Sequence, residues 1–395
     1  MRLNRKYKAF FLLLSFVCLC ISIFVFWNNN RKQLNSSLPI ITKVTYLELP
    51  GWKKGEIFTA KIALEESCKK ILKKQDTTTI KFFDILINLD GYKAFCVQLN
   101  NVKNNKELKK LVEGNFYPVK IEASKEQTLF TGYIELEIKG RLEFSQSDAP
   151  NAVPIYKKPN NLITIDLGLF DDELKNKKIT GLIENNQFVP ASTREQIEKF
   201  NIYKDNIIAY IDDPARAYFL HIQGSGIIKL PKGKNISVGY DGDNGHEYFS
   251  IGRKLIKEGT ITKENMSMQS ITNWMQKNVK EATLLRYNNK RFIFFKERRS
   301  AAGPIGASGA IVTPMHSAAI DNNFIPYHLP LWADVQNFFT DRSDQKHSNL
   351  FLAQDTGAAI KGPTRIDLFL GKGVYPEKTA GRLNSSGSLW AFIPK

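Results

Sequence analysis

Two aspartates near the C-terminal end of the chain have the residue type and spacing that acid–base chemistry requires. Asp355 and Asp367 flank a loop of small residues; an apolar segment, 350–353, precedes the loop and a predicted strand, 366–370, follows it. A chain that turns back here brings the two carboxyl groups close together. Neighbouring carboxylates oppose each other's ionisation, so one of them can keep the proton that a general acid donates. On spacing alone the ordinary alternative stays open, that both aspartates cap turns or face water.

The triplet Asp355-Thr-Gly357 also occurs in aspartic proteases. Those enzymes need two such loops that share one proton, and the chain has neither a second Asp-Thr-Gly nor an Asp-Ser-Gly. A dimeric aspartic protease is therefore kept only as a rival hypothesis. Signatures of zinc, calcium, dinucleotide and serine-hydrolase sites are all missing from the sequence, and we expect no metal and no cofactor.

Composition and charge narrow the class of protein. Hydrophobic residues make up 43% of the 395 residues and charged residues 24%, which suits one large or two ordinary packed domains. The formal net charge is +17, but the lysines are scattered and no zinc-finger or RNA-recognition signature accompanies them. The charge favours an anionic environment, such as a membrane surface or an acidic polymer, over nucleic-acid binding. A solvated, lysine-rich surface is the simpler explanation.

The N-terminal residues predict a membrane anchor. A basic segment, 1–8, precedes an uncharged apolar run, 9–27, which as a helix would extend about 28 Å, enough to cross the hydrocarbon core of a bilayer. The basic flank predicts a cytoplasmic N-terminus with the rest of the chain outside. Since no small-residue cleavage site follows, we predict an uncleaved signal anchor. The polar segment 28–44 is predicted to be a linker.

Two cysteines follow this linker. If this part of the chain is exported, Cys68 and Cys96 can pair as a disulfide; two free buried thiols are the alternative. The rest of the chain has a mixed but mostly β pattern. Segment 65–74 has the periodicity of an amphipathic helix and 128–138 alternates like a strand, while short strands broken by turn residues fill most of 139–251.

Six short motifs occur in a fixed order along the second part of the chain. They are Phe130-Thr-Gly-Tyr133 and the segments 219–226, 239–253, 266–270, 353–362 and 367–369. Together they resemble the membrane-bound lytic murein transglycosylase A family, including its C-terminal three-aspartate (3D) domain, here at about 300–395. The resemblance extends from about residue 130 to the C-terminus.

This resemblance implies a fold. It predicts a mainly β protein with some α-helix, in which a double-psi β-barrel domain carries the aspartates and a second β domain is inserted in the chain. The substrate groove would lie between the two. On this chain the barrel domain would comprise 45–136 and 266–395, and the inserted domain would comprise 137–265.

The resemblance also implies an activity. The family cleaves the β-1,4 bond between N-acetylmuramic acid and N-acetylglucosamine of peptidoglycan without water, leaving a 1,6-anhydromuramic acid end. Asp367 matches the family's catalytic aspartate, and Asp355 and Asp321 match the other two of the trio. One aspartate can act first as acid and then as base, because the attacking C6 hydroxyl belongs to the same sugar. A non-catalytic cell-wall glycan-binding protein is the alternative.

The implied partner is the peptidoglycan glycan strand. The implied location is the periplasmic side of the bacterial envelope, on the inner or outer membrane through the N-terminal anchor. Nine motif residues are expected to contact the glycan: Thr131, Gly132, Tyr133, Gln223, Gly224, Ser225, Gly226, Tyr240 and Asn244. Polar side chains among them offer hydrogen bonds, and the tyrosines offer flat apolar faces for sugar rings. The alternatives are a tight turn at Gly224 and Gly226, and core packing of Tyr240.

Overall fold

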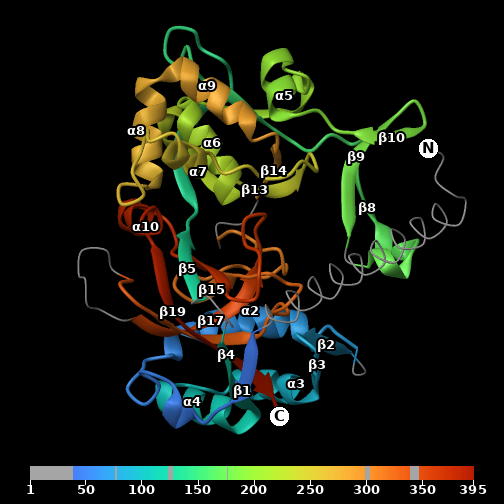
Figure 1. Ribbon diagram of the computed structural model, residues 1–395. Helices are drawn as coiled ribbons and strands as arrows, with labels where there is room; N and C mark the ends of the chain where they lie inside the picture. The colour runs from blue at the N-terminus through green and yellow to red at the C-terminus, as the bar shows by residue number, and fades with distance from the viewer. Residues whose placement is uncertain (1–38, 76–77, 123–127, 176, 299–302, 339–346) are drawn as a thin grey trace, which may run out of the picture.

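The computed structural model describes residues 39–75, 78–122, 128–175, 177–298, 303–338 and 347–395. These residues form a mainly β fold with two bodies, one above the other in Figure 1. Within these ranges, the helices are all too short or too polar to span a membrane. The predicted anchor at 9–27, the basic segment 1–8 and most of the linker lie outside the described residues.

The lower body in Figure 1 is a closed barrel. One sheet has the order β1-β4-β19-β16-β17-β15-β18-β5, and β19 also pairs with β5, so the strands from β19 to β5 form a ring. The ring strands are β5 (Thr128–Tyr133), β15 (Ser317–Ala319), β16 (Pro330–Val335), β17 (His347–Asp355), β18 (Arg365–Phe369) and β19 (Asn384–Pro394). Outside the ring, β4 (Phe116–Glu122) pairs with β19, and β1 (Ile40–Lys43) pairs with β4. This barrel is consistent with the predicted double-psi architecture.

Helices cover one outer face of the barrel, because its strands carry apolar side chains on both faces. Every residue of β16 is buried, and Trp332 of that strand meets Trp52 edge to face, with ring centroids 5.1 Å apart. The covering helices are α2 (Lys61–Ile71), α3 (Asp90–Leu99) and α4 (Asn105–Asn115), and a hairpin of β2 (Thr79–Phe82) and β3 (Ile85–Asn88) lies beside them. A disulfide joins Cys68 of α2 to Cys96 of α3.

The upper body contains a second sheet with helices packed on it (Figure 1). The sheet has the order β14-β13-β12-β6-β11-β7. Its strands are β6 (Leu136–Arg141), β7 (Val153–Tyr156), β11 (Ile207–Ile211), β12 (Ser225–Lys229), β13 (Asn235–Asp243) and β14 (Ile293–Glu297). The helices are α5 (Arg194–Phe200), α6 (Pro214–Gln223), α7 (Ile251–Lys257), α8 (Met268–Lys277) and α9 (Val279–Asn288). A separate arm consists of β8 (Leu162–Asp166), β9 (Lys178–Glu184) and β10 (Gln187–Pro190).

The second sheet extends beyond residue 265, where the sequence placed the end of the inserted domain. β14 pairs with β13, and Phe294 and Phe295 of β14 are fully buried. Their burial explains the difference, since these aromatic side chains complete the core of the upper body. β14 therefore belongs to the upper body, whereas the sequence predicts that all of 266–395 belongs to the barrel domain. The division into domains otherwise stays a prediction.

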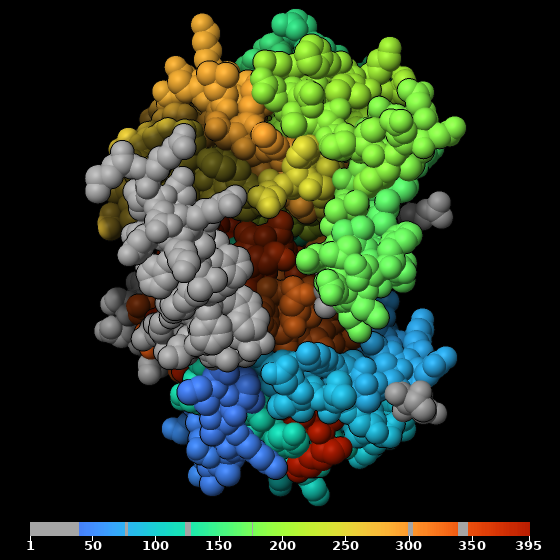
Figure 2. Space-filling view, turned by 45° about the vertical axis from the view of Figure 1, so that its right-hand side comes forward, coloured from blue at the N-terminus to red at the C-terminus, as the bar shows by residue number. Residues whose placement is uncertain are grey.

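On the face shown in Figure 2, a hollow lies between the two bodies. In Figure 2 its floor consists of orange and red residues from the C-terminal part of the chain, with the upper body above, the blue N-terminal part of the barrel body below and the green arm at its right flank. α10 (Val374–Ala380) lies at the top of the barrel, facing the upper body (Figure 1). The predicted fold class, a mainly β protein with a barrel and a second β body, is confirmed.

Candidate active site

Strand register brings Asp355 and Asp367 to the same level of the barrel. β15 lies between β17 and β18, and Ala319 of β15 is opposite Asp355 on one side and Asp367 on the other. The two aspartates are therefore near each other, but they are not on adjacent strands as a simple turn between them would place them. A very short strand from elsewhere in the chain separates them.

Asp367 is partly exposed at this level of the barrel. Its Oδ1 accepts a hydrogen bond from Oγ1 of Thr131, on the neighbouring parallel strand β5, at 2.5 Å. Burial raises the pKa of Asp367, and the negative charge of Asp355 adds to the increase. The positive charge of Arg365 and the Thr131 hydrogen bond act in the opposite direction.

Asp355 is held by three donors. Its Oδ1 accepts hydrogen bonds from the backbone N–H groups of Ala307 and Thr356, each at 2.9 Å, and its Oδ2 accepts one from the hydroxyl of Tyr133 at 2.9 Å. Burial raises the pKa of Asp355, and these hydrogen bonds partly offset the increase because they stabilise the ionised form. Asp355 is thus fixed in place, with both oxygens occupied.

Asp321, the third aspartate of the trio, is only 4% exposed and holds the loop between the other two. Its Oδ2 accepts a hydrogen bond from the N–H of Gly362 at 2.9 Å, and its Oδ1 accepts two from Asn323. Since both carboxylate oxygens are buried and accept these hydrogen bonds, Asp321 holds the 355–367 loop in position.

Tyr133 does not present the free ring face that the sequence predicted. The side chain is buried, its ring packs against Phe369 with centroids 5.1 Å apart, and its hydroxyl donates to Asp355. Gly132 lies beside it, where a Cβ atom would come within 2.9 Å of Leu370 Cδ1. This part of the motif therefore positions Asp355 through Tyr133.

The predicted glycan contact at Asn244 is wrong for a physical reason. Asn244 is 1% exposed, its Nδ2 donates to the carbonyls of Ser192 and Lys290, and its Oδ1 accepts from the N–H of Phe292. The amide joins three backbone segments of the upper body and has no face left for a sugar.

Four of the remaining predicted contacts, residues 223–226, lie at the end of α6 and the start of β12. Gln223 is partly exposed and its Oε1 accepts a hydrogen bond from the N–H of Ile134, which lies at the junction of the two bodies. Ser225 is buried. Gly224 ends α6 in the left-handed conformation with φ of 76°, so the turn alternative applies to it. Gly226 lies in β12, where a Cβ atom would be 2.7 Å from Leu220 Cδ1, so close packing accounts for this glycine.

Tyr240 keeps an accessible ring, with 49% of the residue exposed, and its hydroxyl donates to Asp243 at 2.6 Å. It does not fill the core, which was the alternative. Its contact with a glycan stays a prediction.

The sequence did not reveal the support behind Asp355. Gln354 is fully buried; its Nε2 donates to the carbonyl of Ala63 and to Ser67 Oγ on α2, and its Oε1 accepts from Ser317 Oγ at 2.5 Å. This network fastens β17 to α2 one residue before the carboxylate. A glutamine at the end of an apolar strand was the only available signal. Among the described residues, no group of three or more His, Cys, Asp or Glu is arranged to hold a metal ion.

The arrangement can supply one proton at a time. Asp367 combines partial exposure, a raised pKa and a fixed oxygen, which are the properties of a general acid. Asp355 has both oxygens engaged and influences Asp367 through its charge.

Two family models match the chain. The MltA specific insert domain matches residues 129–296 and the 3D domain matches residues 316–393. The membrane-bound lytic murein transglycosylase A of Escherichia coli (strain K12) is 35% identical over 190 residues, which is 47% of this chain and 52% of that protein. The aligned region thus spans about half the length of that relative. A homolog from Buchnera aphidicola subsp. Schizaphis graminum is 29% identical over 80% of this chain and 87% of its own length.

Solved structures share the fold. A membrane-bound lytic murein transglycosylase from Agrobacterium tumefaciens superposes with a TM-score of 0.78 at 22% identity, covering 90% of this chain and 97% of that one. MltA from Neisseria gonorrhoeae in a monoclinic form gives a TM-score of 0.73 at 28% identity, covering 90% of this chain and 93% of that one. The two family models together cover more than half of this chain, and with these relatives they show that it belongs to the membrane-bound lytic murein transglycosylase A family, with a C-terminal 3D domain.

Proposed function

We propose that this chain is a lytic transglycosylase of peptidoglycan. It would cleave the β-1,4 bond between N-acetylmuramic acid and N-acetylglucosamine and leave a 1,6-anhydromuramic acid end. The observation that carries the proposal is the position of Asp367, a partly exposed residue at the same level of the barrel as Asp355. The carboxylate of Asp367 accepts a hydrogen bond from the hydroxyl of Thr131.

In the first step Asp367 acts as general acid. Its raised pKa favours the protonated form, and the Thr131 hydrogen bond holds Oδ1, so we assign the proton to Oδ2. The proton passes to the glycosidic oxygen as the bond between that oxygen and C1 of the muramic acid breaks. The N-acetylglucosamine then leaves with a hydroxyl group.

In the second step the same carboxylate acts as base. It accepts the proton of the C6 hydroxyl while the C6 oxygen bonds to C1 of the same sugar, which restores protonated Asp367. Glycosidases that use water need a second carboxylate, which either activates the water or attacks the sugar itself. Here the nucleophile is part of the substrate, and Asp355, with both oxygens occupied, is not needed as that second base.

A glycan strand would lie in the hollow between the two bodies (Figure 2). A solved structure of E. coli MltA, with a TM-score of 0.63 at 25% identity, has bound chitohexaose, and this supports a saccharide as the ligand. Tyr240 and Gln223 are predicted contacts on the upper body whose side chains are at least partly exposed. The reaction requires no cofactor, metal or nucleic acid.

The envelope is the proposed location. Relatives are named membrane-bound, and the apolar run 9–27 would anchor the chain with the barrel on the periplasmic side. Mass spectrometry of the mature N-terminus tests whether that run is retained, and loss of the run would overturn the anchor.

Replacing Asp367 with Asn tests the assigned role. Purified sacculi are digested and anhydro-muropeptides are measured by mass spectrometry; we expect the variant to release them at least about 100-fold more slowly. The control is the same substitution at Asp84, whose side chain is 89% exposed in the β2–β3 turn. Undiminished product from the Asp367 variant would refute the role of Asp367. Wild-type protein that binds sacculi without forming anhydro ends would support a glycan-binding function instead.

A further inference from the structure

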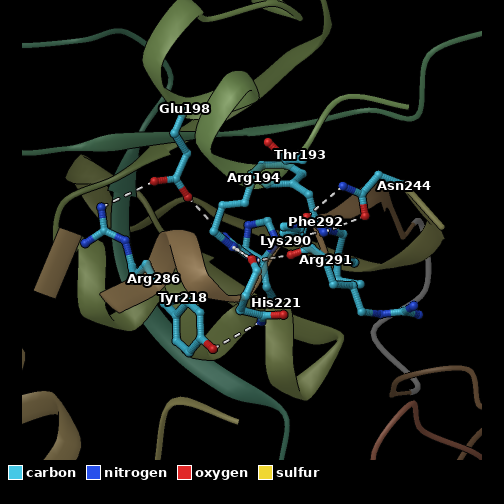
Figure 3. A network of polar contacts seen from close by, with 12 residues as sticks. Thr193, Arg194, Glu198, Tyr218, His221, Asn244, Arg286, Lys290, Arg291 and Phe292 are labelled. Carbon is cyan, nitrogen blue, oxygen red and sulfur yellow. Dashed lines mark hydrogen bonds and ion pairs between the residues drawn. The ribbon is translucent and has the colours of Figure 1, made fainter. Parts of the chain in front are cut away.

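A small cavity lies inside the upper body, apart from the proposed catalytic residues. Residues of β7, α5, α6 and α9 line it, together with Phe292 just before β14. Figure 3 shows the polar side chains of this region, among them Arg194, Glu198 and Arg286. Its volume is about 50 Å³. One buried water requires roughly 10–15 Å³, so the cavity has room for about three to five non-hydrogen atoms.

The charged residues that line the cavity do not balance. Glu198 bridges two arginines: its Oε1 is 3.0 Å from Arg194 Nη1 and its Oε2 is 3.3 Å from Arg286 Nη2. The arginine side chains are only 2% and 9% exposed. Two guanidinium groups face one carboxylate among the lining residues, which leaves one positive charge unmatched in a place where water screens it poorly.

Arg194 is engaged by the fold itself. Its Nε and Nη2 donate to the carbonyls of Asn289 and Arg291, and its guanidinium group lies 5.2 Å from the ring centroid of Tyr218 and 5.0 Å from that of Phe292. These contacts, together with Glu198, explain why Arg194 is buried, and they identify it as a structural residue.

Arg286 differs from Arg194 in this respect. In the part of the chain that the structure describes, its side chain makes a single hydrogen bond, from Nη2 to Glu198. The guanidinium group lines the cavity and carries five N–H donors, so most of them have no protein partner among the described residues. A planar acceptor with two oxygens matches this geometry best.

His221 provides a second donor at the cavity wall. Its Nδ1 accepts a hydrogen bond from the N–H of Ile293 at 3.1 Å, which places the ring proton on Nε2. Burial lowers the pKa of His221, and the nearby charges of Arg194 and Arg286 lower it further. The imidazole is therefore neutral and offers one N–H to an occupant.

The rest of the wall is apolar, with Val153, Pro154 and Ala217 among its residues. We propose that this cavity binds a small free carboxylate, of the size of acetate or propionate, whose oxygens accept hydrogen bonds from Arg286 and His221. Its alkyl group would contact the apolar wall, and its charge would balance the second guanidinium group. The small volume excludes a sugar ring or a peptide as the occupant.

Thermal unfolding of the full chain in sodium propionate, sodium acetate, sodium chloride and neutral propionamide tests the proposal. We expect a saturable rise in Tm with propionate and acetate, and none with propionamide or with chloride at equal ionic strength. Equal responses to propionate and propionamide, equal responses to propionate and chloride, or no saturable response would overturn it.

A variant pair assigns the effect to the cavity. Arg286→Gln should weaken propionate binding at least about tenfold in calorimetry, because a charge-assisted hydrogen bond is lost. Arg253→Gln, an exposed arginine on α7 of the same body, is the matched control and should leave the Kd unchanged. If Arg286→Gln does not fold, Ala217→Val decides: it narrows the cavity without changing charge and should abolish binding. An unchanged Kd in a folded Arg286→Gln or Ala217→Val protein would refute the site.

Discussion

Thr131 and Asp367 are direct neighbours on the parallel strands β5 and β18, and the hydroxyl of Thr131 donates to Oδ1 of Asp367 at 2.5 Å. Two consequences follow from this contact. The bond fixes the orientation of the carboxyl group, and it stabilises the ionised form against the burial that raises the pKa of Asp367. β5 is also the last barrel strand before the chain enters the upper body, so the acid is positioned by the strand that joins the two bodies.

Replacing Thr131 with Val removes this donor at similar side-chain size. We expect the pKa of Asp367 to rise further, so the alkaline limb of kcat/KM for release of anhydro-muropeptides should move to higher pH. A hydrogen bond to a charged group contributes about 1.5–3 kcal/mol, which corresponds to a rate loss of roughly 10- to 100-fold if it is fully expressed in the transition state. Thr131→Ser keeps the donor and should resemble the wild type. An unshifted pH profile in the Val variant would contradict the positioning role.

Asp355 and Arg365 should shift the same pH profile in opposite directions. The charge of Asp355 raises the pKa of Asp367, and the charge of Arg365 lowers it. Asp355→Asn should therefore move the alkaline limb to lower pH, and Arg365→Gln should move it to higher pH. The measurement is the initial rate of anhydro-product release between pH 4 and 8, with the double variant as a check for partial cancellation. Shifts in the same direction would show that the limb does not report Asp367.

The pairing of Asp355 and Asp367 was predictable in part. The loop between them and the strand 366–370 were recognisable from local pattern, because turn residues and apolar runs act over a few positions. The insertion of β15 between their strands was not, since three small or polar residues at 317–319 carry no signal for which strands they join. Strand partners are set by packing across the whole barrel, and single-sequence periodicity does not contain that information.

The wrong prediction at Asn244 and the unexpected burial of Tyr133 have a similar origin. A motif states which residue types are present but not which way each side chain faces. Asn244 satisfies backbone groups and Tyr133 supports Asp355, and both uses are compatible with the same motif. The order of the motifs, which resembles that of the family, was enough to locate the site. The role of each side chain could be seen only from the register of the sheets.

His328 should make folding stability fall in mildly acidic solution. It is buried between α2 and the barrel, and burial, with the charges of Lys74 and Lys70, lowers its pKa to about 4. The unfolded chain binds this proton below about pH 6.5 and the folded protein does not until about pH 4. The stability that neutral His328 contributes is complete above pH 6.5 and is lost towards pH 4. Over this range the free energy of unfolding falls by up to about 1.4 kcal/mol per pH unit.

His328→Asn should reduce that slope, measured as the free energy of urea unfolding at several pH values. Asparagine suits the position because the backbone there has φ of 75°. The raised pKa values of Asp355 and Asp367 contribute a slope of opposite sign, so the difference between variant and wild type is the relevant quantity. Parallel curves between pH 4 and 6.5 would contradict the prediction, and equal slopes above pH 7 serve as the internal control.

Glu135 and Arg298 form a buried ion pair where the chain passes between the two bodies. Glu135 lies between β5 and β6, Arg298 follows β14, and their side chains are 4% and 6% exposed. Removing one partner leaves the other charge buried and unpaired, so we expect Glu135→Leu or Arg298→Met alone to reduce the free energy of unfolding by about 3–5 kcal/mol. The double variant should lose much less than the sum, because no charge then stays buried.

A double-mutant cycle by urea unfolding measures this coupling. The comparison cycle is the pair Lys254–Glu258 on α7, whose side chains are 33% and 48% exposed and for which the coupling should be about 0.3–0.5 kcal/mol. A Glu135–Arg298 coupling no larger than that would mean that water reaches the junction freely. Since both residues lie where the chain crosses between the bodies, such a result would also imply that the junction is open enough for the bodies to move relative to each other.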